Sequence, residues 1–338
     1  MTLLEKYLAL VCDLDGVVYR GPSAVPHAVE ALQDCPLQVL YATNNASRPP
    51  EAVAAHLRDL GLKAVADDVV TSSQAGAHYL AGRLPAGSAV LAVGGEGVAQ
   101  ALSERGLMPT RAAEAAPGSE GGFAAVLQGY GANVTAADLA EAAYAVQHGA
   151  LWVATNTDPT LPTDRGTAPG NGSLVAAVAQ ATGQEPTVVG KPHGTLYLLC
   201  AERVHHDPRQ LLAVGDRLDT DIAGAVETGM DSALVLTGVD TPASLATAPA
   251  SMRPTYLLED LRGLHTAYLP AQSEADGWWA CGAHRRRIVA GHWESEGVPG
   301  TPVEGLRAAI AAVHAAVDDS DLDSDDARRL VLEAVAGQ

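Results

Sequence analysis

Short runs of β-branched and aliphatic residues alternate with longer stretches rich in alanine and glutamate, up to about residue 235. The apolar runs have the length of buried strands, and the stretches between them are long enough for helices. The expected strands are LALVC, LQVLYA, VLAVG, AAVLQG, LWVAT, LLAVGD and SALVLTG. This alternation predicts an α/β fold of the doubly wound, Rossmann-like type, with a parallel sheet covered by helices on both faces.

Two stretches carry helix punctuation. Residues 47–61 have prolines near the start and a glycine at the end, and residues 173–183 also end in glycine. Proline suits the first helical turn, and glycine suits the position just after the last turn. The sequence predicts a helix over each range, with Ser173 as a candidate N-cap of the second.

The texture of the chain changes after residue 265. Three tryptophans and three consecutive arginines lie between residues 278 and 293. Residues 277–297 are expected to form two strands joined by a turn, followed by a helix over 303–317. The acidic stretch 318–329 is interpreted as a capped helix start or a solvated loop, because it lacks the glycine and ligand spacing of a calcium loop. Residues 266–338 are therefore predicted to be a C-terminal extension.

Composition narrows the class of protein. The chain has 338 residues, of which 47% are hydrophobic, enough for a sizeable core and two domains. No apolar run is long enough to cross a membrane, the start does not resemble a secretory signal, and the four cysteines stand far apart. We therefore expect a cytoplasmic globular protein with isolated thiols and no membrane insertion.

Net charge bears on the partners. The formal charge of −19 argues against nucleic acid, because phosphate backbones attract basic surfaces. An anionic substrate would have to be attracted locally, by a metal ion or by a few cations.

Two aspartates follow the first predicted strand. Asp13 and Asp15 stand two residues apart, with Gly16 next. The carboxyl ends of parallel strands are where open α/β sheets place their ligands, and glycine permits a sharp turn there. By themselves, the two aspartates fit a ligand site and a capped turn about equally well.

Neutral and basic groups follow two further strands. Thr43, Asn44 and Asn45 end one of them, and Lys191 follows another just before a proline. The hydroxyl and amides fit either phosphate binding or a helix cap. A lysine near a helix start is electrostatically unfavourable unless an anion also binds, so Lys191 is a candidate for either a site or the surface.

A fourth strand ends in acidic residues. Asp216 follows LLAVG directly, and Asp219 and Asp221 come soon after it. Carboxylates gathered near Asp13 would repel one another unless a divalent cation neutralised them, and an all-oxygen ligand set suits Mg²⁺. The alternative for Asp219 is a helix-dipole partner.

Taken together and in order, the segments DLDGV, TNN, GKP and GDRLDTD resemble the four motifs of the haloacid dehalogenase superfamily over about residues 5–265. The resemblance implies that Asp13 is a nucleophile that forms an aspartyl-phosphate and that Asp15 is the general acid and base. It further implies Mg²⁺ bound by Asp13, by Asp216 and by the backbone carbonyl of Asp15, with Asp221 supporting from the second layer. Thr43 and Lys191 would contact the phosphoryl group, with help from Asn44.

The 147 positions between Asn44 and Lys191 predict an inserted domain. The expected boundaries are 1–83 and 185–265 for the core and 84–184 for an α/β cap, as in the 4-nitrophenyl-phosphatase-like subfamily. Residues 153–183 resemble that subfamily too, which would place the loop of Gly170, Asn171 and Gly172 near the substrate.

Within the subfamily, the resemblance is greatest to actinobacterial glycerol-3-phosphate phosphatases, which implies glycerol 3-phosphate as substrate. The alternatives are a broad-specificity sugar- or nucleotide-phosphate phosphatase and, outside enzymes, a phospho-receiver-like switch. The resemblance would make the extension an acetyltransferase-like remnant. We expect it to serve packing or a homodimer contact, because no acetyl-CoA pyrophosphate loop is evident.

Overall fold

The computed structural model describes residues 1–114, 122–163, 165–297 and 300–336. The chain divides into two compact units. The first unit comprises Met1–Arg20, Ala24–Gln38 and Arg209–Gln338, and the second comprises Gly21–Ser23 and Val39–Pro208.

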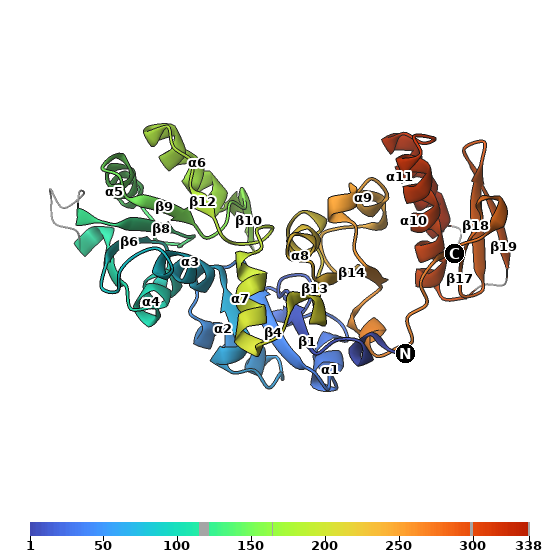
Figure 1. Ribbon diagram of the computed structural model, residues 1–338, viewed down its shortest axis with the longest axis horizontal. Helices are drawn as coiled ribbons and strands as arrows, with labels where there is room; N and C mark the ends of the chain where they lie inside the picture. Colours follow the sequence, from blue (N-terminus) through green and yellow to red (C-terminus); the bar gives the residue numbers. More distant parts are fainter. Residues whose placement is uncertain (115–121, 164, 298–299, 337–338) are drawn as a thin grey trace. The chain divides into compact units, whose positions relative to one another are not determined.

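A parallel sheet forms the centre of the first unit (Figure 1). Within this unit, the strands of the sheet lie in the order β15 (Tyr256–Leu258), β14 (Asp231–Val235), β13 (Leu211–Gly215) and β1 (Ala9–Cys12). Nearly every residue of these strands is buried, which explains why they read as unbroken apolar runs. The connecting helices are α1 (Ala28–Gln33), α8 (Ala223–Thr228) and α9 (Pro242–Ala246). Two short strands, β2 (Tyr19–Arg20) and β3 (Ser23–Ala24), follow β1.

The C-terminal extension also belongs to the first unit. An antiparallel sheet of β16 (Gln272–Ser273), β17 (Trp279–Cys281), β18 (His284–Val289) and β19 (His292–Gly297) precedes α10 (Pro302–Asp318) and α11 (Ser324–Ala336). The structure thus adds two short strands and a second helix to the two strands and one helix expected. Strands of two or three residues are too short to show a period of two in the sequence.

The acidic segment before α11 caps that helix. The Asp323 carboxylate accepts hydrogen bonds from the backbone N–H groups of Asp325 and Asp326, at 3.0 and 2.9 Å. These donors belong to the first turn, where backbone N–H groups lack partners within the helix. The interpretation of this segment as a capped helix start is therefore confirmed.

The second unit contains two groups of parallel strands. β4 (Gln38–Thr43) pairs with β5 (Val69–Thr71). A five-stranded sheet has the order β12 (Thr187–Val188), β9 (Leu151–Ala154), β8 (Ala125–Gln128), β6 (Ala89–Val93) and β7 (Met108–Arg111). The helices are α2 (Pro50–Asp59), α3 (Ser72–Ala81), α4 (Glu96–Glu104), α5 (Ala136–Gln147), α6 (Asn171–Thr182) and α7 (Thr195–Val204). β10 (Thr160–Thr163) and β11 (Gly166–Pro169) form an antiparallel hairpin.

All seven predicted strands are present, and the predicted α/β fold of parallel sheets with flanking helices is confirmed. The candidate N-cap Ser173 is wrong. Helix α6 begins at Asn171 with Gly170 at the N-cap, and the Ser173 hydroxyl donates to the Pro159 carbonyl at 2.7 Å. The helix starts earlier because the backbone turns at a glycine that packs closely on the preceding segment.

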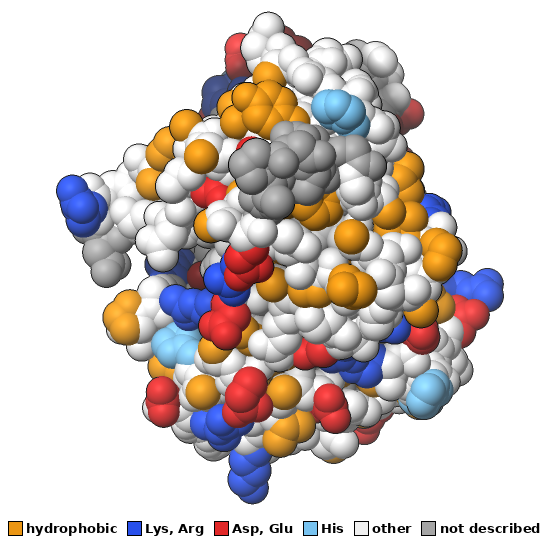
Figure 2. All heavy atoms as spheres, turned by 90° about the vertical axis from the view of Figure 1, so that its left-hand side faces the viewer, with side chains coloured by type: hydrophobic (Ala, Val, Ile, Leu, Met, Phe, Trp, Pro, Cys, Tyr) orange, Lys and Arg blue, Asp and Glu red, His pale blue; other side chains and the backbone are white. Residues whose placement is uncertain are grey.

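Two further observations concern the length of the helices and the distribution of charge on the surface. Of the helices within the described ranges, none has both the length and the apolar character needed to cross a bilayer. On the face drawn in Figure 2, lysine and arginine side chains are dispersed, and several adjoin acidic ones.

Candidate active site

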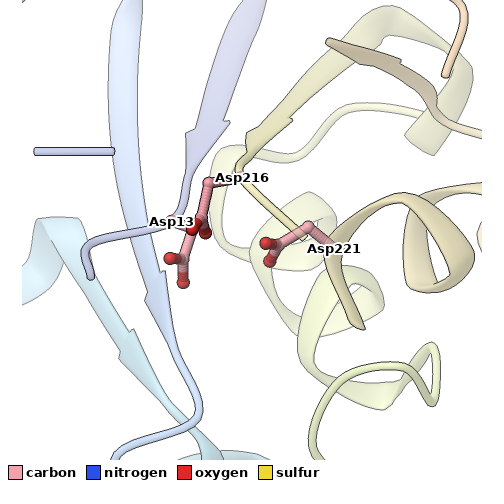
Figure 3. Close-up of side chains that lie close together, drawn as sticks. All are labelled: Asp13, Asp216 and Asp221. Carbon is pink, nitrogen blue, oxygen red and sulfur yellow. The ribbon is translucent and has the colours of Figure 1, made fainter. Parts of the chain in front are cut away.

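Three aspartates of the first unit meet at the carboxyl edge of its sheet (Figure 3). Asp13 follows β1 and Asp216 follows β13, and these two parallel strands are paired with Cys12 opposite Val214. The Asp13 N–H continues the ladder by donating to the Val214 carbonyl at 2.8 Å. One carboxylate oxygen of each of Asp13, Asp216 and Asp221 lies within 4.8 Å of the other two. We call these three residues the aspartate cluster.

Close backbone packing fixes Asp216 within the cluster. Its side chain is buried, with 1% of the residue exposed. A Cβ atom at Gly238 would lie only 1.7 Å from Asp216 Oδ2, and one at Gly16 would lie 2.4 Å from the same oxygen. Gly16 also has φ of +86°, which side chains other than hydrogen disfavour. Glycine is therefore required on both sides of this carboxylate.

Backbone N–H groups of the loop after β14 donate hydrogen bonds to Asp216. The N–H of Val239 donates to Asp216 Oδ2 at 2.7 Å, and the N–H of Asp240 donates to the Asp216 carbonyl at 3.1 Å. The Asp240 carboxylate in turn accepts from the Leu218 N–H at 2.7 Å. The sequence interpretation missed this loop, although its place directly after a predicted strand was the signal that could have revealed it.

Asp221 reaches the cluster from a different local structure. It lies on a turn of π-helix, Leu218–Ile222, and its Oδ2 accepts from the Arg217 N–H at 3.1 Å. Asp219, on the same turn, forms an ion pair with the Arg217 guanidinium at 2.8 Å and is not part of the cluster. Wide turns of this kind occur often at functional sites. Here the turn brings the Asp221 carboxylate to the aspartate cluster and leaves that of Asp219 to the ion pair with Arg217.

The donor set fits a divalent cation. Asp216 and Asp221 are almost fully buried and Asp13 is half-buried, so three carboxylates share a small volume with restricted access to water. Mutual repulsion makes such a group costly when all three are ionised and no cation is near. Carboxylate oxygens on rigid strand ends are the ligands that Mg²⁺ prefers.

Asp15 differs from the cluster in exposure. It is exposed to solvent, two residues beyond Asp13, in a turn closed by the Gly16 N–H donating to the Tyr19 carbonyl at 2.8 Å. The Thr237 hydroxyl donates to the Gly16 carbonyl at 2.8 Å and holds this turn against the loop after β14. An exposed carboxylate on a fixed turn is able to exchange protons with a bound substrate and with water.

Lys191, Asn44 and Thr43 come together in the second unit. Lys191 is 4% exposed, and its ammonium donates to the Ala42 carbonyl at 3.1 Å. The Asn44 side chain accepts from the Lys191 N–H at 2.8 Å and donates to the Lys191 carbonyl at 3.0 Å. Thr43 ends β4, is buried, and accepts from the Asn45 N–H at 3.0 Å. The structure thus places a buried cation and a hydroxyl at the end of one strand.

A chain of asparagines supports Asn44. The Asn156 amide donates to the Asn44 carbonyl at 2.7 Å, and the Asn171 amide donates to the Asn156 carbonyl at 2.7 Å. Both supporting residues are buried. We call Asn44, Asn156 and Asn171 the asparagine relay. It joins the start of α6 to the segment that holds Lys191.

The remaining candidate residues have structural contacts as well. The side-chain oxygen of Asn45 accepts hydrogen bonds from the N–H and the hydroxyl of Ser47, at 3.0 and 2.7 Å. A Cβ at Gly170 would lie 2.3 Å from the Asp158 carbonyl oxygen, and one at Gly172 would lie 2.2 Å from that of Thr157. These glycines therefore allow α6 to begin against the segment that follows β9.

Comparison with known proteins identifies families and relatives that the chain resembles. Residues 10–108 match the family model for haloacid dehalogenase-like hydrolases, and residues 188–264 match a second model described as HAD-hydrolase-like. A D-glycerol 3-phosphate phosphatase of Mycobacterium tuberculosis is 46% identical over 278 residues, which are 82% of this chain and 76% of that protein.

Solved structures agree. The crystal structure of a glycerol phosphate phosphatase from Mycobacterium tuberculosis in complex with magnesium has a TM-score of 0.82 at 41% identity and covers 93% of this chain and 92% of its own. A p-nitrophenyl phosphatase from Archaeoglobus fulgidus has a TM-score of 0.68 at 27% identity and covers 77% of this chain and 98% of its own. On the fold, the four motifs and these matches, the chain belongs to the haloacid dehalogenase-like hydrolase family.

Proposed function

We propose that this hydrolase is a Mg²⁺-dependent phosphatase that acts on small phosphomonoesters, with glycerol 3-phosphate as its main substrate. The observation that carries the proposal is the aspartate cluster at the ends of β1 and β13, in a chain that is 46% identical to a D-glycerol 3-phosphate phosphatase. Carboxylates at this edge are suited to nucleophilic attack on phosphorus and to binding a cation.

The first step transfers the phosphoryl group to the protein. A carboxylate oxygen of Asp13 attacks phosphorus, and the bond between phosphorus and the ester oxygen breaks. Asp15 donates its proton to that oxygen, so glycerol leaves as a neutral alcohol. The exposure of Asp15 and the half-buried position of Asp13 support these separate roles.

The second step regenerates the enzyme. Asp15, now a carboxylate, takes a proton from a water molecule whose oxygen attacks the phosphorus of the aspartyl-phosphate. The bond between phosphorus and the Asp13 oxygen breaks, and inorganic phosphate leaves. One carboxylate serves as acid and then as base, as reversible proton transfer at one position requires.

Residues of the aspartate cluster would hold the cation. The proposed ligands are carboxylate oxygens of Asp13 and Asp216 and the backbone carbonyl of Asp15. Asp221 would not bind the cation directly but would support the ligands from the second layer. When bound, Mg²⁺ supplies positive charge that stabilises the oxygens of the transferring phosphoryl group. The relative crystallised in complex with magnesium supports this choice of ion.

Further site residues are proposed from the order of the sequence motifs. We assign Lys191 and Thr43 to the phosphoryl oxygens, with Asn44 assisting, because the order of their motifs matches the family pattern. Positioned charges of this kind usually make the largest contribution to catalysis. Asn45 and the segment of Gly170, Asn171 and Gly172 are proposed to lie nearer the rest of the substrate.

Domain boundaries form part of the proposal. Residues 84–184 are assigned to the cap, 1–83 and 185–265 to the core, and 266–338 to the extension. A cytoplasmic location is supported by the cysteines, which form no disulfide in the part of the chain that the structure describes: Cys12, Cys35, Cys200 and Cys281. A homodimer is proposed as the assembled form.

A panel of phosphomonoesters tests the substrate. We expect the highest kcat/KM with glycerol 3-phosphate, and a lower value with sugar phosphates, nucleotides and 4-nitrophenyl phosphate. Equal values across the panel would favour the alternative, a broad-specificity phosphatase, which the similarity to a p-nitrophenyl phosphatase supports.

A further inference from the structure

Helices of the C-terminal extension share a hydrophobic core with the turn that carries Asp221. Leu218 and Ile222 begin and end this turn, and both side chains are buried. They belong to a single cluster with residues of β14, α9 and β15 and with residues of α10 and α11. The members from the extension are Leu306, Ile310, Val313, Ala327, Leu330 and Val331.

A second connection runs through α9. His314 Nε2 on α10 lies 2.8 Å from the Leu245 carbonyl oxygen on α9, a hydrogen bond when this nitrogen carries the proton. Helix α9 begins at Pro242, directly after the loop whose Val239 N–H binds the Asp216 carboxylate. The extension is therefore hydrogen-bonded to the helix that directly follows the loop around Asp216. In Figure 1, α10 and α11 stand beside α9.

An ion pair one turn further along α10 contacts the same region. The Arg253 guanidinium makes two hydrogen bonds to the Asp318 carboxylate, at 2.6 and 2.7 Å. The Arg253 Nε also donates to the Ala248 carbonyl at 2.9 Å, just past α9. Two parallel hydrogen bonds give this pair a defined geometry.

The extension is additional to the smaller fold of related phosphatases. The second family match ends at residue 264, and the p-nitrophenyl phosphatase is matched over 98% of its length by only 77% of this chain. Yet Val313, Leu330 and Val331 are completely buried, as core residues of a single folded unit are.

We propose that α10 and α11 position Asp216 and Asp221 for the divalent cation, acting through α9 and through the turn of Leu218–Ile222. This inference rests on the proposed function and goes beyond it, because it makes the affinity for the cation depend on residues of the extension. Groups that orient metal ligands from behind influence metal affinity strongly, and a loosened turn would lose part of that orientation.

Val313→Ala is the test, with Val178→Ala as the matched control. Each variant removes two methyl groups from a fully buried valine. Val313 shares its core cluster with Leu218 and Ile222 of the turn, whereas Val178 belongs to a core cluster of the second unit that contains no residue of that turn. The readout is the Mg²⁺ concentration that gives half of the maximal rise in unfolding temperature without substrate. We expect this concentration to increase at least about threefold in Val313→Ala and to be unchanged in Val178→Ala.

The outcomes separate the inference from the proposed function. A wild-type protein that releases no phosphate from any ester refutes the proposed function. The inference alone is overturned if the wild-type protein needs Mg²⁺ for activity and Val313→Ala reaches half of its maximal rise in unfolding temperature at the same Mg²⁺ concentration as the wild type. If Val313→Ala does not fold, Asp318→Asn decides in the same assay, because it removes only the exposed negative charge that faces Arg253 and leaves the buried core unchanged. An unchanged Mg²⁺ requirement in that variant would also overturn the inference.

Discussion

The side chain of Asn44 makes hydrogen bonds to both backbone polar groups of Lys191, 147 positions later in the chain. One amide therefore fixes the backbone of the buried lysine that is assigned to the phosphoryl group. The Asn156 side-chain amide in turn donates a hydrogen bond to the backbone carbonyl of Asn44. The position of Lys191 thus depends on the side chains of Asn44 and Asn156.

Asn44→Leu should lower kcat by roughly tenfold to a hundredfold, because small displacements of a catalytic group cost rates of that order. The substitution keeps the size of the side chain and removes both hydrogen bonds to Lys191. Steady-state kinetics with glycerol 3-phosphate gives the result, and Asn133→Leu, at an exposed position of the same unit, is the control. A kcat equal to that of the wild type would refute the positioning role.

Gly238→Ala should disturb the cation site by steric conflict. The added Cβ would lie 1.7 Å from Asp216 Oδ2, so the carboxylate or the loop must move. We expect a loss of about 1–3 kcal/mol in the free energy of unfolding and a higher Mg²⁺ requirement. Gly122→Ala is the control, since a Cβ there meets no atom within 4 Å. Equal stability and equal Mg²⁺ dependence of both variants would contradict the observed packing.

Removal of divalent cations should abolish activity reversibly. Chelation by EDTA takes away the charge that lets the aspartate cluster coexist near an anionic substrate, and added Mg²⁺ should restore the full rate. The measurement is phosphate release before and after each addition. Activity that is indifferent to both reagents would remove the cation from the mechanism.

Asp15→Asn should slow turnover while leaving attack by Asp13 possible. The amide neither protonates the leaving oxygen efficiently nor activates water, so both steps suffer, by roughly a hundredfold or more. Rapid-quench experiments should show a phosphorylated protein that decays slowly. Normal steady-state rates in this variant would exclude Asp15 as the acid and base.

Much of the first unit could be predicted from the sequence because its strands are buried on both faces. Continuous apolar runs such as residues 211–215 leave little doubt about a strand, and the aspartates after two such runs meet because neighbouring parallel strands end at one edge. The extension was harder to predict. Strand β17 has three residues and is defined by its pairing with β18, which no local pattern reveals.

Hydrogen bonds between distant backbone groups were also beyond the sequence. The roles of Asn156 and Asn171 depend on carbonyls brought near by the packing of α6, and amides of this kind are equally common in turns and caps. The loop of Gly238–Asp240 contains no conspicuous motif. Its contribution to Asp216 became evident only from the backbone N–H of Val239.

The most direct test of the account is the identity of the residue that carries the phosphoryl group. Asp15→Asn protein is mixed with glycerol 3-phosphate labelled on phosphorus and Mg²⁺, quenched in acid, digested, and the labelled peptide is sequenced. The proposed mechanism predicts label on Asp13, no label in the double variant Asp13→Asn with Asp15→Asn, and a loss of turnover by roughly ten-thousandfold or more in Asp13→Asn alone. Label on another residue, or substantial turnover by folded Asp13→Asn protein, would contradict it.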